Sequence, residues 1–352
     1  MSPRGTDWGL ALLVAVMVAT GVLTWFSGEK GDAWVYATHG VAGGALALLL
    51  VWKLRRVAGR LRLPRWDRRT AFGAVALTLV AATLASGWIW ITAGRVDLAG
   101  YTLLAWHTLL GGLLGAAVAV HLVLRAKRPR ARDVVGRRQL LEAGAIGLGG
   151  LLAWRVQRPL AEWLGLPGAR RRFTGSYEAD SFTGNAFPTT SWVADDPRPL
   201  SAETYRLRVE GLVARPLTLA LAELDVGDEE VATLDCTGGF YSTQRWRGIR
   251  IARLIDRAGP LPTASHVRVV SHTQYRWTFE LSEARELLLA TEVGGELLSH
   301  GHGAPVRLVA AARRGFQWVK WVERLELRDS PDYGAFPSTL WSSFTPEGRG
   351  NA

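Results

Sequence analysis

Residues 101–124 read YTLLAWHTLLGGLLGAAVAVHLVL, a stretch with no Asp, Glu, Lys or Arg but with two histidines, His107 and His121. An α-helix rises 1.5 Å per residue, so about 20 apolar residues cross the roughly 30 Å hydrocarbon core of a bilayer. The stretch therefore predicts a membrane-spanning helix. Because ionisable side chains are costly inside a membrane, both histidines are candidates for a functional role.

Three further stretches are long and apolar enough to cross a membrane, and Trp or Tyr marks several of their ends, as is usual at the membrane interface. A fifth stretch, Leu140–Val156, contains Glu142 and four glycines and is a weaker candidate. We expect residues 1–124 to form an all-α bundle of four transmembrane helices, and residues 125–156 to form a basic loop and a fifth anchor helix. The three further stretches are Trp8–Phe26, Trp34–Trp52 and Ala71–Ile91.

The positive charge of the chain is concentrated in two segments. The 352 residues carry a formal net charge of +11, but residues 53–69 hold eight Lys and Arg against one Asp, and residues 125–138 hold seven against one Asp. The remainder is slightly acidic, which excludes a broadly basic nucleic-acid-binding surface. By the positive-inside rule both segments are cytoplasmic. The chain then starts in the cytoplasm, crosses the plasma membrane five times and leaves residues 157–352 outside.

A pair of arginines precedes the fifth candidate span. Arg137 and Arg138, one spacer and two leucines, followed by a mildly apolar Gly-rich run, resemble a twin-arginine export signal. Export of this kind carries proteins that are already folded around a cofactor. An ordinary basic stop before a helix is the alternative.

His39 and His107 lie five and six residues into the second and fourth spans, which both begin at the outer face. At 1.5 Å per residue, each imidazole lies roughly 8–9 Å below that face. Glycines follow both histidines and would let a flat macrocycle press against the helix backbones. We predict that His39 and His107 bind the iron of a b-type haem near the outer surface. The alternative is a pair of interhelical hydrogen bonds.

His121 lies on the same helix face as His107, fourteen residues further along. Helices with two histidines at this interval resemble those of di-haem membrane cytochromes b. The residue fourteen positions after His39 is Lys53, however, which argues against a second haem. A quinone pocket and the inner membrane interface are the other interpretations of His121, and quinone is the expected electron partner.

After residue 156 the sequence predicts a linker and then a mixed α+β domain. Residues 157–180 are rich in Arg and Gly and poorly patterned, and we expect residues 181–352 to form the domain. Ile251–Ala258 predicts a short amphipathic helix, Ser282 the cap of another, and Gly294-Gly295 a hairpin. The expected strands are Tyr205–Val209, Val231–Leu234, Val267–Val270, Arg276–Leu281, Pro305–Ala311 and Val319–Leu327.

Cys236 is the only cysteine, which excludes an intrachain disulfide and any multi-cysteine zinc or iron–sulfur site. It follows an expected strand and precedes a Thr-Gly-Gly turn that a large ligand could approach. A single protein thiolate suffices for a soft metal only where a cofactor supplies the other ligands. The alternatives are a buried structural cysteine and a nucleophile with a histidine base such as His272.

Four ordered motifs resemble the molybdopterin-binding domain of the sulfite oxidase family over roughly residues 180–328. They are Cys-Thr-Gly-Gly at 236–239, Trp-Arg-Gly-Ile at 246–249, His-Gly-Ala-Pro-Val-Arg at 302–307, and Gly315 with Val-Lys-Trp at 319–321. Their joint order is far more specific than any one of them. The resemblance implies an oxidoreductase domain that binds a molybdenum–molybdopterin cofactor, here fused to a cytochrome b-like helical domain.

The resemblance also implies a role for each matching residue. Cys236 would be the catalytic residue and the molybdenum ligand. Arg307 and Lys320 would contact the pterin phosphate, which as a dianion needs charge-assisted hydrogen bonds. His272 is the alternative to Ser271 at one strand end. The residues implied to bind the cofactor are Asn185, Cys236, Ser271, His302, Arg307, Trp318, Val319 and Lys320.

The substrate class follows from a departure from the family pattern. Sulfite-oxidising relatives carry arginines shortly after the cysteine, where this chain has Phe240, Tyr241 and Ser242. An aromatic, weakly charged mouth suits a neutral organic molecule better than a small dianion. We expect a membrane-bound enzyme that transfers an oxygen atom by reducing a small substrate such as a sulfoxide or N-oxide. The alternatives are oxidation of a small substrate such as sulfite, with electrons passed inward, and a haem or quinone module without turnover.

Overall fold

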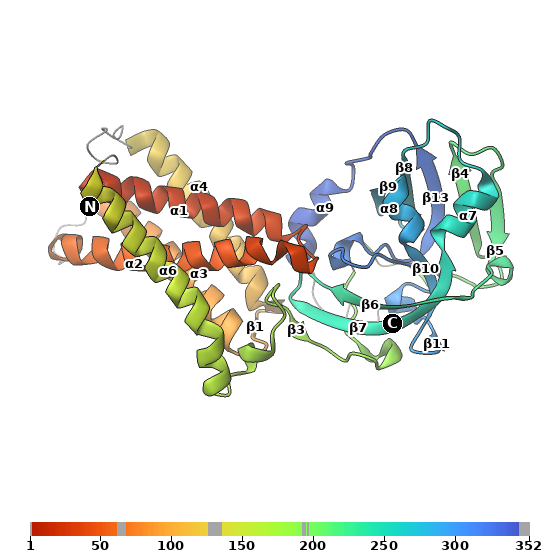
Figure 1. Ribbon diagram of the computed structural model, residues 1–352, viewed down its shortest axis with the longest axis horizontal. Helices are drawn as coiled ribbons and strands as arrows, with labels where there is room; N and C mark the ends of the chain where they lie inside the picture. The colour runs from red at the N-terminus through yellow and green to blue at the C-terminus, as the bar shows by residue number, and fades with distance from the viewer. Residues whose placement is uncertain (1, 62–67, 126–135, 192–194, 196, 345–352) are drawn as a thin grey trace. The chain divides into compact units, whose positions relative to one another are not determined.

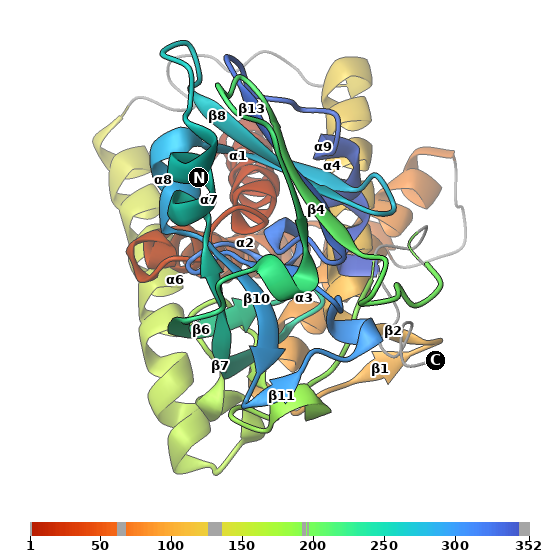
Figure 2. The same cartoon turned by 90° about the vertical axis from the view of Figure 1, so that its right-hand side faces the viewer.

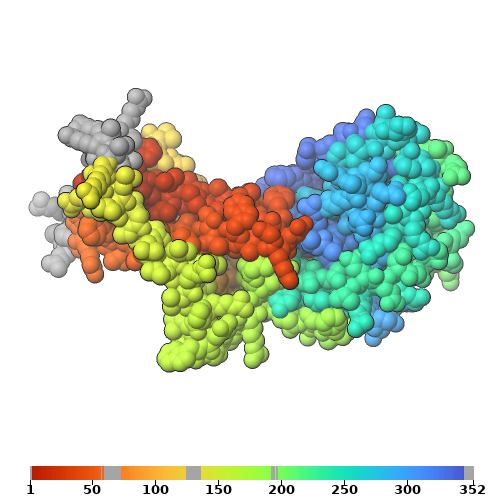
Figure 3. Space-filling model, viewed as in Figure 1, coloured from red at the N-terminus to blue at the C-terminus, as the bar shows by residue number. Residues whose placement is uncertain are grey.

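The computed structural model describes residues 2–61, 68–125, 136–191, 195 and 197–344. It divides into two compact units, Met1–Tyr177 and Glu178–Ala352. Figure 1 and the space-filling view in Figure 3 colour the first unit from red to yellow-green and the second from green to blue. The first unit is helical and the second is built mainly of strands, which confirms the expected fold class. Parts of both basic segments, 62–67 and 126–135, lie outside the described residues.

Four helices of the first unit are long and apolar enough to cross a membrane, as predicted. The fourth begins two residues later than expected, because Tyr101 and Thr102 belong to a tight hairpin in which Ala99 and Gly100 both have positive φ. The four helices are α1 (Pro3–Thr24), α2 (Ala33–Leu61), α3 (Arg68–Thr92) and α4 (Leu103–Arg125). The short elements between them are η1 (Lys30–Asp32), β1 (Asp97–Leu98) and β2 (Tyr101–Thr102).

A fifth helix, α6 (Arg137–Trp163), extends beyond the predicted anchor at both ends and is less apolar than the other four. It runs antiparallel along α2, since Gly40 faces Trp154 and Gly44 faces Gly150. At the second contact the backbones touch: a Cβ on Gly44 would lie 3.1 Å from the Gly150 Cα. Figure 3 shows α6, in yellow to yellow-green, on the outside of this unit. Small residues thus pack a weakly apolar helix closely against an apolar one.

The interior of the helical unit is apolar and is shared by three helices. α1 packs against both α2 and α4, and α3 packs against α4. Val14, Leu46 and Leu114 form the buried cluster between α1, α2 and α4. The segment expected as a linker belongs largely to this unit, because α6 continues to Trp163 and the helix η2 (Pro167–Arg170) packs on α3.

The second unit contains two sheets with helices beside them. Figure 2 separates the sheets, with β8, β13 and β4 in the upper part of the view and β6, β7 and β10 below. The first sheet has the order β5-β4-β13-β8-β9, in which β4 and β13 are parallel and the other neighbours antiparallel. Its strands are β4 (Arg206–Gly211), β5 (Leu217–Ala220), β8 (His266–Ser271), β9 (Arg276–Glu280) and β13 (Val322–Arg328).

In the second sheet, β7 pairs with β6 on one side and with β10 on the other, and β10 also pairs with β11 and β12. Another strand, β3 (Tyr177–Glu178), lies at the boundary of the two units. The strands of this sheet that lie wholly in the second unit are β6 (Asp228–Asp235), β7 (Phe240–Arg250), β10 (Leu288–Val293), β11 (Glu296–Leu297) and β12 (Arg307–Val309).

The expected local elements of this unit are present with one exception. The helix at residues 251–258 has the predicted bounds, and Gly294-Gly295, both at positive φ, join β10 to β11 as a hairpin. Ser282 is not a cap, because β9 runs directly into the next helix and Glu280 stands at its N-cap with an extended backbone. The helices are α7 (Ile251–Ala258), α8 (Leu281–Glu286), α9 (Phe336–Trp341), η3 (Gly184–Ala186), η4 (Leu221–Glu223), η5 (His300–His302), η6 (Gly315–Gln317) and η7 (Ser342–Phe344).

Candidate functional site

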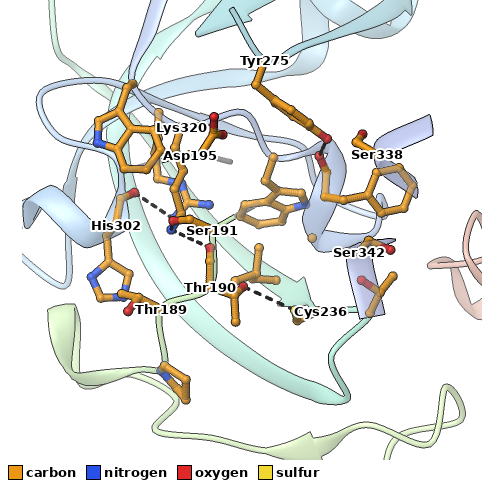
Figure 4. Close-up of a pocket in the computed structure, with 18 of the residues that line it drawn as sticks. Thr189, Thr190, Ser191, Asp195, Cys236, Tyr275, His302, Lys320, Ser338 and Ser342 are labelled. Atoms are coloured by element: carbon orange, nitrogen blue, oxygen red, sulfur yellow. Dashed lines mark hydrogen bonds between the residues drawn. The ribbon is translucent and has the colours of Figure 1, made fainter. Parts of the chain in front are cut away.

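A cavity in the second unit gathers most of the residues singled out above. Its lining combines aromatic side chains with a small number of polar and charged groups, as is usual for small-molecule and cofactor sites. Figure 4 shows Cys236 and Ser342 toward one end of it and His302 toward the other. The cavity is lined by Phe187, Pro188, Thr189, Thr190, Ser191, Asp195, Leu234, Cys236, Thr237, Tyr275, His302, Arg307, Gly315, Phe316, Trp318, Lys320, Trp321, Ser338 and Ser342.

Cys236 directly follows β6 and is buried. Its Sγ accepts a hydrogen bond from the Gly238 N–H at 3.3 Å, and Thr190 Oγ1 lies 3.6 Å away, as drawn in Figure 4. Burial raises the pKa of the Cys236 thiol, although the Gly238 N–H and the Thr190 hydroxyl both favour the thiolate. The sulfur is therefore held as a thiol in a setting whose hydrogen bonds suit the thiolate that a bound cation would create.

A buried ion pair fixes the backbone behind this thiol. Arg314 Nη1 donates to Asp235 Oδ1 at 2.6 Å, and Arg314 Nη2 donates to the Cys236 carbonyl at 3.3 Å. The two side chains are 5% and 1% exposed. Because these charge-assisted hydrogen bonds hold the guanidinium in place, Arg314 positions Cys236 and is turned away from any ligand of the sulfur.

Three basic side chains meet at the other end of the cavity. Arg307 lies on β12, His302 ends η5, and Lys320 precedes β13. Gly303, at φ 103°, allows this approach, because a Cβ there would lie 3.0 Å from the Lys320 Cβ and 3.1 Å from the Arg307 Cβ. Lys320 Nζ donates to the Thr190 carbonyl at 2.7 Å, and Arg307 Nη1 donates to the His302 carbonyl at 3.0 Å.

The electrostatics of this cluster require an anion. Burial lowers the pKa of Arg307 to about 9, and burial together with the Arg307 charge lowers that of Lys320 to about 7. Burial, Arg307 and Lys320 lower the pKa of His302 to about 3. The Arg307 Nε is buried and has no hydrogen-bond partner. An unpartnered buried donor among mutually repelling cations fits the dianionic phosphate of a molybdopterin.

Asn185 lies off the cavity lining. Its Oδ1 accepts a hydrogen bond from the Ser299 N–H at 2.9 Å, and its Nδ2 donates to the Leu297 carbonyl at 2.9 Å. Asn185 thereby ties η3 to the end of β11 and the start of η5. It supports the loop that ends in His302 and does not itself face the cavity.

Ser271, Val319 and His272 are also absent from the lining. Ser271 is buried at the end of β8, and Val319 is buried with its carbonyl accepting from the Leu308 N–H at 2.7 Å. The His272 Nδ1 lies 2.5 Å from a carboxylate oxygen of Glu323, and its side chain is 44% exposed. Cys236, His302, Arg307, Trp318 and Lys320 are the predicted residues that the fold brings to one cavity.

Several lining residues were not identified from the sequence. Thr190 belongs to a polar run, residues 189–191, that follows Asn185 closely, so proximity to a pterin motif could have drawn attention to it. Ser338 and Ser342 come from α9 and η7, in which the serines are buried while Phe336, Leu340 and Trp341 are exposed. The remaining ones are Phe187, Pro188, Thr189, Ser191, Asp195, Leu234, Tyr275 and Phe316.

The aromatic side chains at the mouth of the cavity are not the ones predicted from the sequence. Phe240 starts β7 and is fully buried, and neither Phe240 nor Tyr241 lines the cavity. The strand turns these side chains into the sheet packing instead. Tyr275 and Phe316 supply the aromatic surface, and the Tyr275 hydroxyl donates to the Phe316 carbonyl at 2.5 Å. The weakly charged character that the sequence suggested is retained by different side chains.

A second candidate site lies in the helical unit, where His39 of α2 and His107 of α4 face each other. Their ring centroids are 6.1 Å apart. Two imidazoles that share one metal place their centroids about 6 Å apart, given metal–nitrogen bonds of about 2 Å. The structure thus brings together the two histidines that the sequence paired. His121 lies on the exposed side of α4 and is not part of this pair.

The hydrogen bonds of the two rings define their tautomer. Thr20 Oγ1 lies 2.9 Å from His39 Nδ1 and donates to the Val16 carbonyl, so it must accept from the imidazole. His107 Nδ1 lies 3.0 Å from the Thr83 carbonyl, which can only accept. Both protons therefore sit on Nδ1 and both Nε2 atoms carry a lone pair, as in histidines that bind a metal through Nε2.

Comparison with known proteins bears on the second unit. Residues 194–336 match the family described as the oxidoreductase molybdopterin binding domain. The protein-methionine-sulfoxide reductase catalytic subunit MsrP of Gluconobacter oxydans (strain 621H) is 29% identical, over 47% of this chain and 57% of that protein. The MsrP of Burkholderia mallei (strain ATCC 23344) is 28% identical, over 63% and 76%. Mitochondrial sulfite oxidase of Rattus norvegicus is 29% identical, over 47% and 35%.

Among solved structures, the sulfane dehydrogenase SoxCD from Paracoccus pantotrophus shares 25% identity over 39% of this chain and 41% of that chain. The TM-score is 0.38, which is too low to establish a common fold. This chain spans 57% of the length of the Gluconobacter protein and 35% of the rat enzyme, so it shares a domain with them and not a whole architecture.

The second unit is therefore a molybdopterin-binding oxidoreductase domain, the domain type of molybdenum-dependent oxidoreductases. It belongs with the sulfite oxidase-like proteins, as the ordered motifs between Cys236 and Trp321 imply.

Proposed function

We propose that this chain is a membrane-bound molybdenum enzyme that reduces a neutral sulfoxide or N-oxide outside the cytoplasmic membrane. The observation that carries the substrate class is the separation of charge along the cavity. Of the described lining residues, the basic ones are Arg307, Lys320 and His302, which gather where the pterin phosphate fits. The described lining at the thiol end carries no cation, and burial raises the pKa of the acidic lining residue Asp195. The names of the two MsrP relatives, protein-methionine-sulfoxide reductases, favour the same direction.

The chain would hold the cofactor at both ends of the cavity. Cys236 would bind molybdenum through its thiolate, and Arg307 would donate a charge-assisted hydrogen bond to the phosphate through its unpartnered Nε. Lys320, whose ammonium donates to Thr190, Ser191 and Gly301, would add positive charge beside it. When bound, the molybdenum cofactor supplies oxygen-atom transfer coupled to two electrons. His302 already uses both ring nitrogens, toward Ser299 Oγ at 2.8 Å and the Phe187 carbonyl at 3.0 Å, so it positions the pocket wall.

The wall beside the thiol would bind the substrate without charge. Reduction of a sulfoxide takes two electrons and two protons and yields the sulfide and water. Burial raises the pKa of Tyr275 to about 12, so its hydroxyl stays protonated and uncharged, with its proton directed to the Phe316 carbonyl. Ser338 and Ser342 add neutral hydroxyls on the same side of the cavity. Such an uncharged surface suits a neutral sulfoxide, whereas a small dianion would lack a cation there.

We further propose that His39 and His107 bind one b-type haem. The 6.1 Å centroid separation and the Nδ1 hydrogen bonds, which leave a lone pair on each Nε2, both fit this group. Gly87 also fits, because a Cβ there would lie 2.9 Å from His107 Cε1 and displace the ring. A haem exchanges single electrons, so it would pass electrons one at a time between the quinone pool and the molybdenum domain.

The sidedness of the proposal rests on α6. Four crossings alone would return the chain to the cytoplasm after α4. The antiparallel packing of α6 along Gly40–Leu48 of α2, a stretch inside a candidate span, supports a fifth crossing that leaves the second unit outside. Arg137 and Arg138 stand in the first turn of α6, as a cytoplasmic twin-arginine signal before an anchor would require.

Oxidation of sulfite is the second candidate function. It is favoured by the rat sulfite oxidase, which is as similar to this chain as the Gluconobacter MsrP is. It would run electrons in the opposite direction, from the cavity toward the haem and the quinone. The two candidates therefore differ in which substrate changes the haem oxidation state, and from which starting state.

The test is spectroscopic and uses the purified full chain. After anaerobic reduction of the haem, methyl sulfoxides, amine N-oxides and chlorate are added singly, and we expect a sulfoxide or N-oxide to reoxidise it. Sulfite is then added to the oxidised protein, and we expect no reduction. If sulfite alone moves the haem band, oxidation of sulfite replaces our proposal. Cys236→Ser is the matched control and should abolish either response.

Two further measurements exclude other interpretations. Protein that contains haem but neither molybdenum nor pterin would be a non-enzymatic membrane module. Iodoacetamide should leave Cys236 unmodified in the mature protein, because a metal-bound thiolate is protected. Rapid alkylation in molybdenum-loaded protein would favour a cysteine nucleophile instead.

A further inference from the structure

The segment after α6 closes one end of the helical bundle. Gly168 lies against the last turn of α3, where a Cβ would come within 2.0 Å of the Ile91 carbonyl. Phe173 packs edge-on against Tyr36 near the start of α2, with ring centroids 5.5 Å apart. Arg172 donates to the Gly28 carbonyl between α1 and α2 at 3.4 Å. Residues 167–177 thus cap the end at which α3 finishes and α2 begins.

Arg171 is the most buried cation of this cap. It is 8% exposed, and its guanidinium lies over the Trp90 ring with 4.2 Å to the centroid. Nη1 donates to the Gly175 carbonyl at 2.8 Å, and Nη2 donates to the carbonyls of Ala93 and Gly94 at 3.2 and 3.1 Å. Among the described residues its hydrogen-bond partners are carbonyls, and no carboxylate forms an ion pair with it.

Two buried donors remain unused at this point. The Nε of Arg171 and the Nε1 of Trp90 are both buried without a hydrogen-bond partner, and Trp90 is only 3% exposed. Gly175 leaves room beside the indole nitrogen, since a Cβ there would lie 3.5 Å from Trp90 Nε1. A buried unpaired donor costs free energy, and a buried cation without a counter-charge costs more. Burial alone lowers the pKa of Arg171 to about 10.

These donors stand one helical turn from the histidine pair. Trp90 is four residues beyond Ser86 on α3, and Ser86 Oγ lies 3.1 Å from His107 Nδ1. Tyr36, which packs on the cap, is three residues before His39 on α2. One turn of helix is 5.4 Å long. A haem between the two histidines has its two propionate side chains on one edge of the ring, so they extend past the iron by a distance of this order.

We propose that the Arg171 guanidinium and the Trp90 indole N–H bind the propionate carboxylates of the haem held by His39 and His107. This inference rests on the proposed haem and adds its orientation, with the propionates toward the cap of residues 167–177. The carboxylates supply the acceptor for both unused donors and the counter-charge for the buried cation. Arg171 is therefore a haem-binding residue that also ties the cap to α3.

The experiment compares Arg171→Gln with Arg170→Gln in the purified full chain. Arg170 is the neighbouring arginine and is exposed, so both changes remove one cation from the same segment. The readout is the haem midpoint potential as a function of pH. We expect Arg171→Gln to lower the potential, because loss of a nearby cation favours the more positive oxidised haem, and to raise the pH at which the propionates titrate. Arg170→Gln should match the wild type.

Reconstitution with haem dimethyl ester tests the carboxylates directly. The ester removes the propionate charge, so it should alter the potential of the wild type and abolish the propionate titration in both the wild type and Arg171→Gln. Trp90→Phe keeps an aromatic side chain and removes the indole N–H, and should shift the potential in the same direction by less. We also expect Arg171→Gln to release haem to apomyoglobin roughly tenfold faster, the size of one hydrogen bond to a charged group.

Failure of the propionate assignment can be distinguished from failure of the proposed haem site. If Arg171→Gln folds and equals Arg170→Gln in potential and titration, the propionate assignment is wrong. If Arg171→Gln does not fold, an unchanged potential in both Trp90→Phe and the ester-reconstituted wild type overturns it. If instead His39→Ala or His107→Ala keeps the low-spin spectrum, the proposed haem site itself fails, whatever the Arg171 variants do.

Discussion

The two candidate redox sites of this chain bury polar groups in opposite ways. In the helical unit, His39 and His107 lie with ring centroids 6.1 Å apart, and each directs its Nδ1 proton to an oxygen of a neighbouring helix, which leaves a lone pair on Nε2. In the second unit, Arg307 and Lys320 are held close together, and the Nε of Arg307 is buried without a partner. Two imidazole lone pairs suit the iron of a haem, whereas clustered cations and one thiol suit an anionic cofactor that brings its own metal ligands. In each site the group that lacks a partner, an imidazole lone pair in one and a positive charge in the other, therefore indicates the class of ligand.

The sharpest way to separate the sites is to remove the thiol. Cys236→Ser should abolish turnover, by on the order of 10³-fold or more, because metal-centred chemistry is lost with the metal. The haem spectrum should be unchanged. Molybdenum analysis and the optical spectrum of one preparation check both statements. Thr190→Val, which removes only the hydroxyl 3.6 Å from the sulfur, is the control and should retain molybdenum.

The converse change addresses the helical site. His39→Ala and His107→Ala should each abolish the low-spin b-type spectrum, since one imidazole cannot supply both axial ligands. Molybdenum and pterin should remain bound in the second unit. His121→Ala is the matched control, because it removes a histidine from the exposed side of the same helix as His107. Loss of the spectrum with His121→Ala alone would contradict the pairing.

For the basic end of the cavity, where Arg307 and Lys320 lie, we expect an effect of intermediate size on retention of the cofactor. Arg307→Gln should weaken retention of the pterin by roughly ten- to a hundredfold, the contribution of hydrogen bonds to a charged group. Pterin content after extensive dialysis is the measurement. Arg208→Gln changes an exposed arginine on β4 and should leave retention unchanged. Equal retention in the two variants would mean that the cluster does not bind the phosphate.

The two sites also show which structural features can be predicted from the sequence alone. The four spans were predicted because apolar length is a local property, and the thiol turn because Cys-Thr-Gly-Gly is contiguous. The pairing of His39 with His107 followed from equal depth in two helices that start at the same face. In each case the information lies within one short segment or in a simple count along a helix.

Other parts of the sites depend on packing between distant segments. Ser338 and Ser342 line the cavity because α9 turns its polar side inward and its apolar side outward, the reverse of the usual pattern. Arg171 lies in a stretch whose composition resembles a linker, and only its position over Trp90 shows its burial. Phe240 was assigned to the mouth by its distance along the chain from Cys236, but the strand pleat turns it into the core.

The smallest expected effect concerns the segment that carries α9 to the cavity. Asp332 precedes α9 and accepts hydrogen bonds from Arg268 Nη1 at 2.7 Å, Arg276 Nε at 2.6 Å and the Gly334 N–H at 2.8 Å. Arg276 foremost, with the Gly334 N–H and Arg268, lowers the pKa of this carboxyl far below its usual range. We expect Asp332→Asn to destabilise the second unit by about 1–2 kcal/mol at pH 6. Asp329→Asn, at an exposed position, should have no such effect.

The pH dependence of this difference follows from the sign of the shift. A carboxyl whose pKa is lowered by folding contributes its stability above the pKa of the unfolded chain, about 4, and loses it as the pH falls toward the folded value. The gap in melting temperature between wild type and Asp332→Asn should therefore be full at pH 6, roughly 2–8 °C, and narrow below pH 4. Thermal unfolding of the full chain, followed by tryptophan fluorescence at several pH values, measures it. A difference in melting temperature that stayed constant down to pH 3 would mean that the charge of Asp332 does not contribute to stability. The wall of the cavity near Cys236 would then be held by packing and not by this carboxylate.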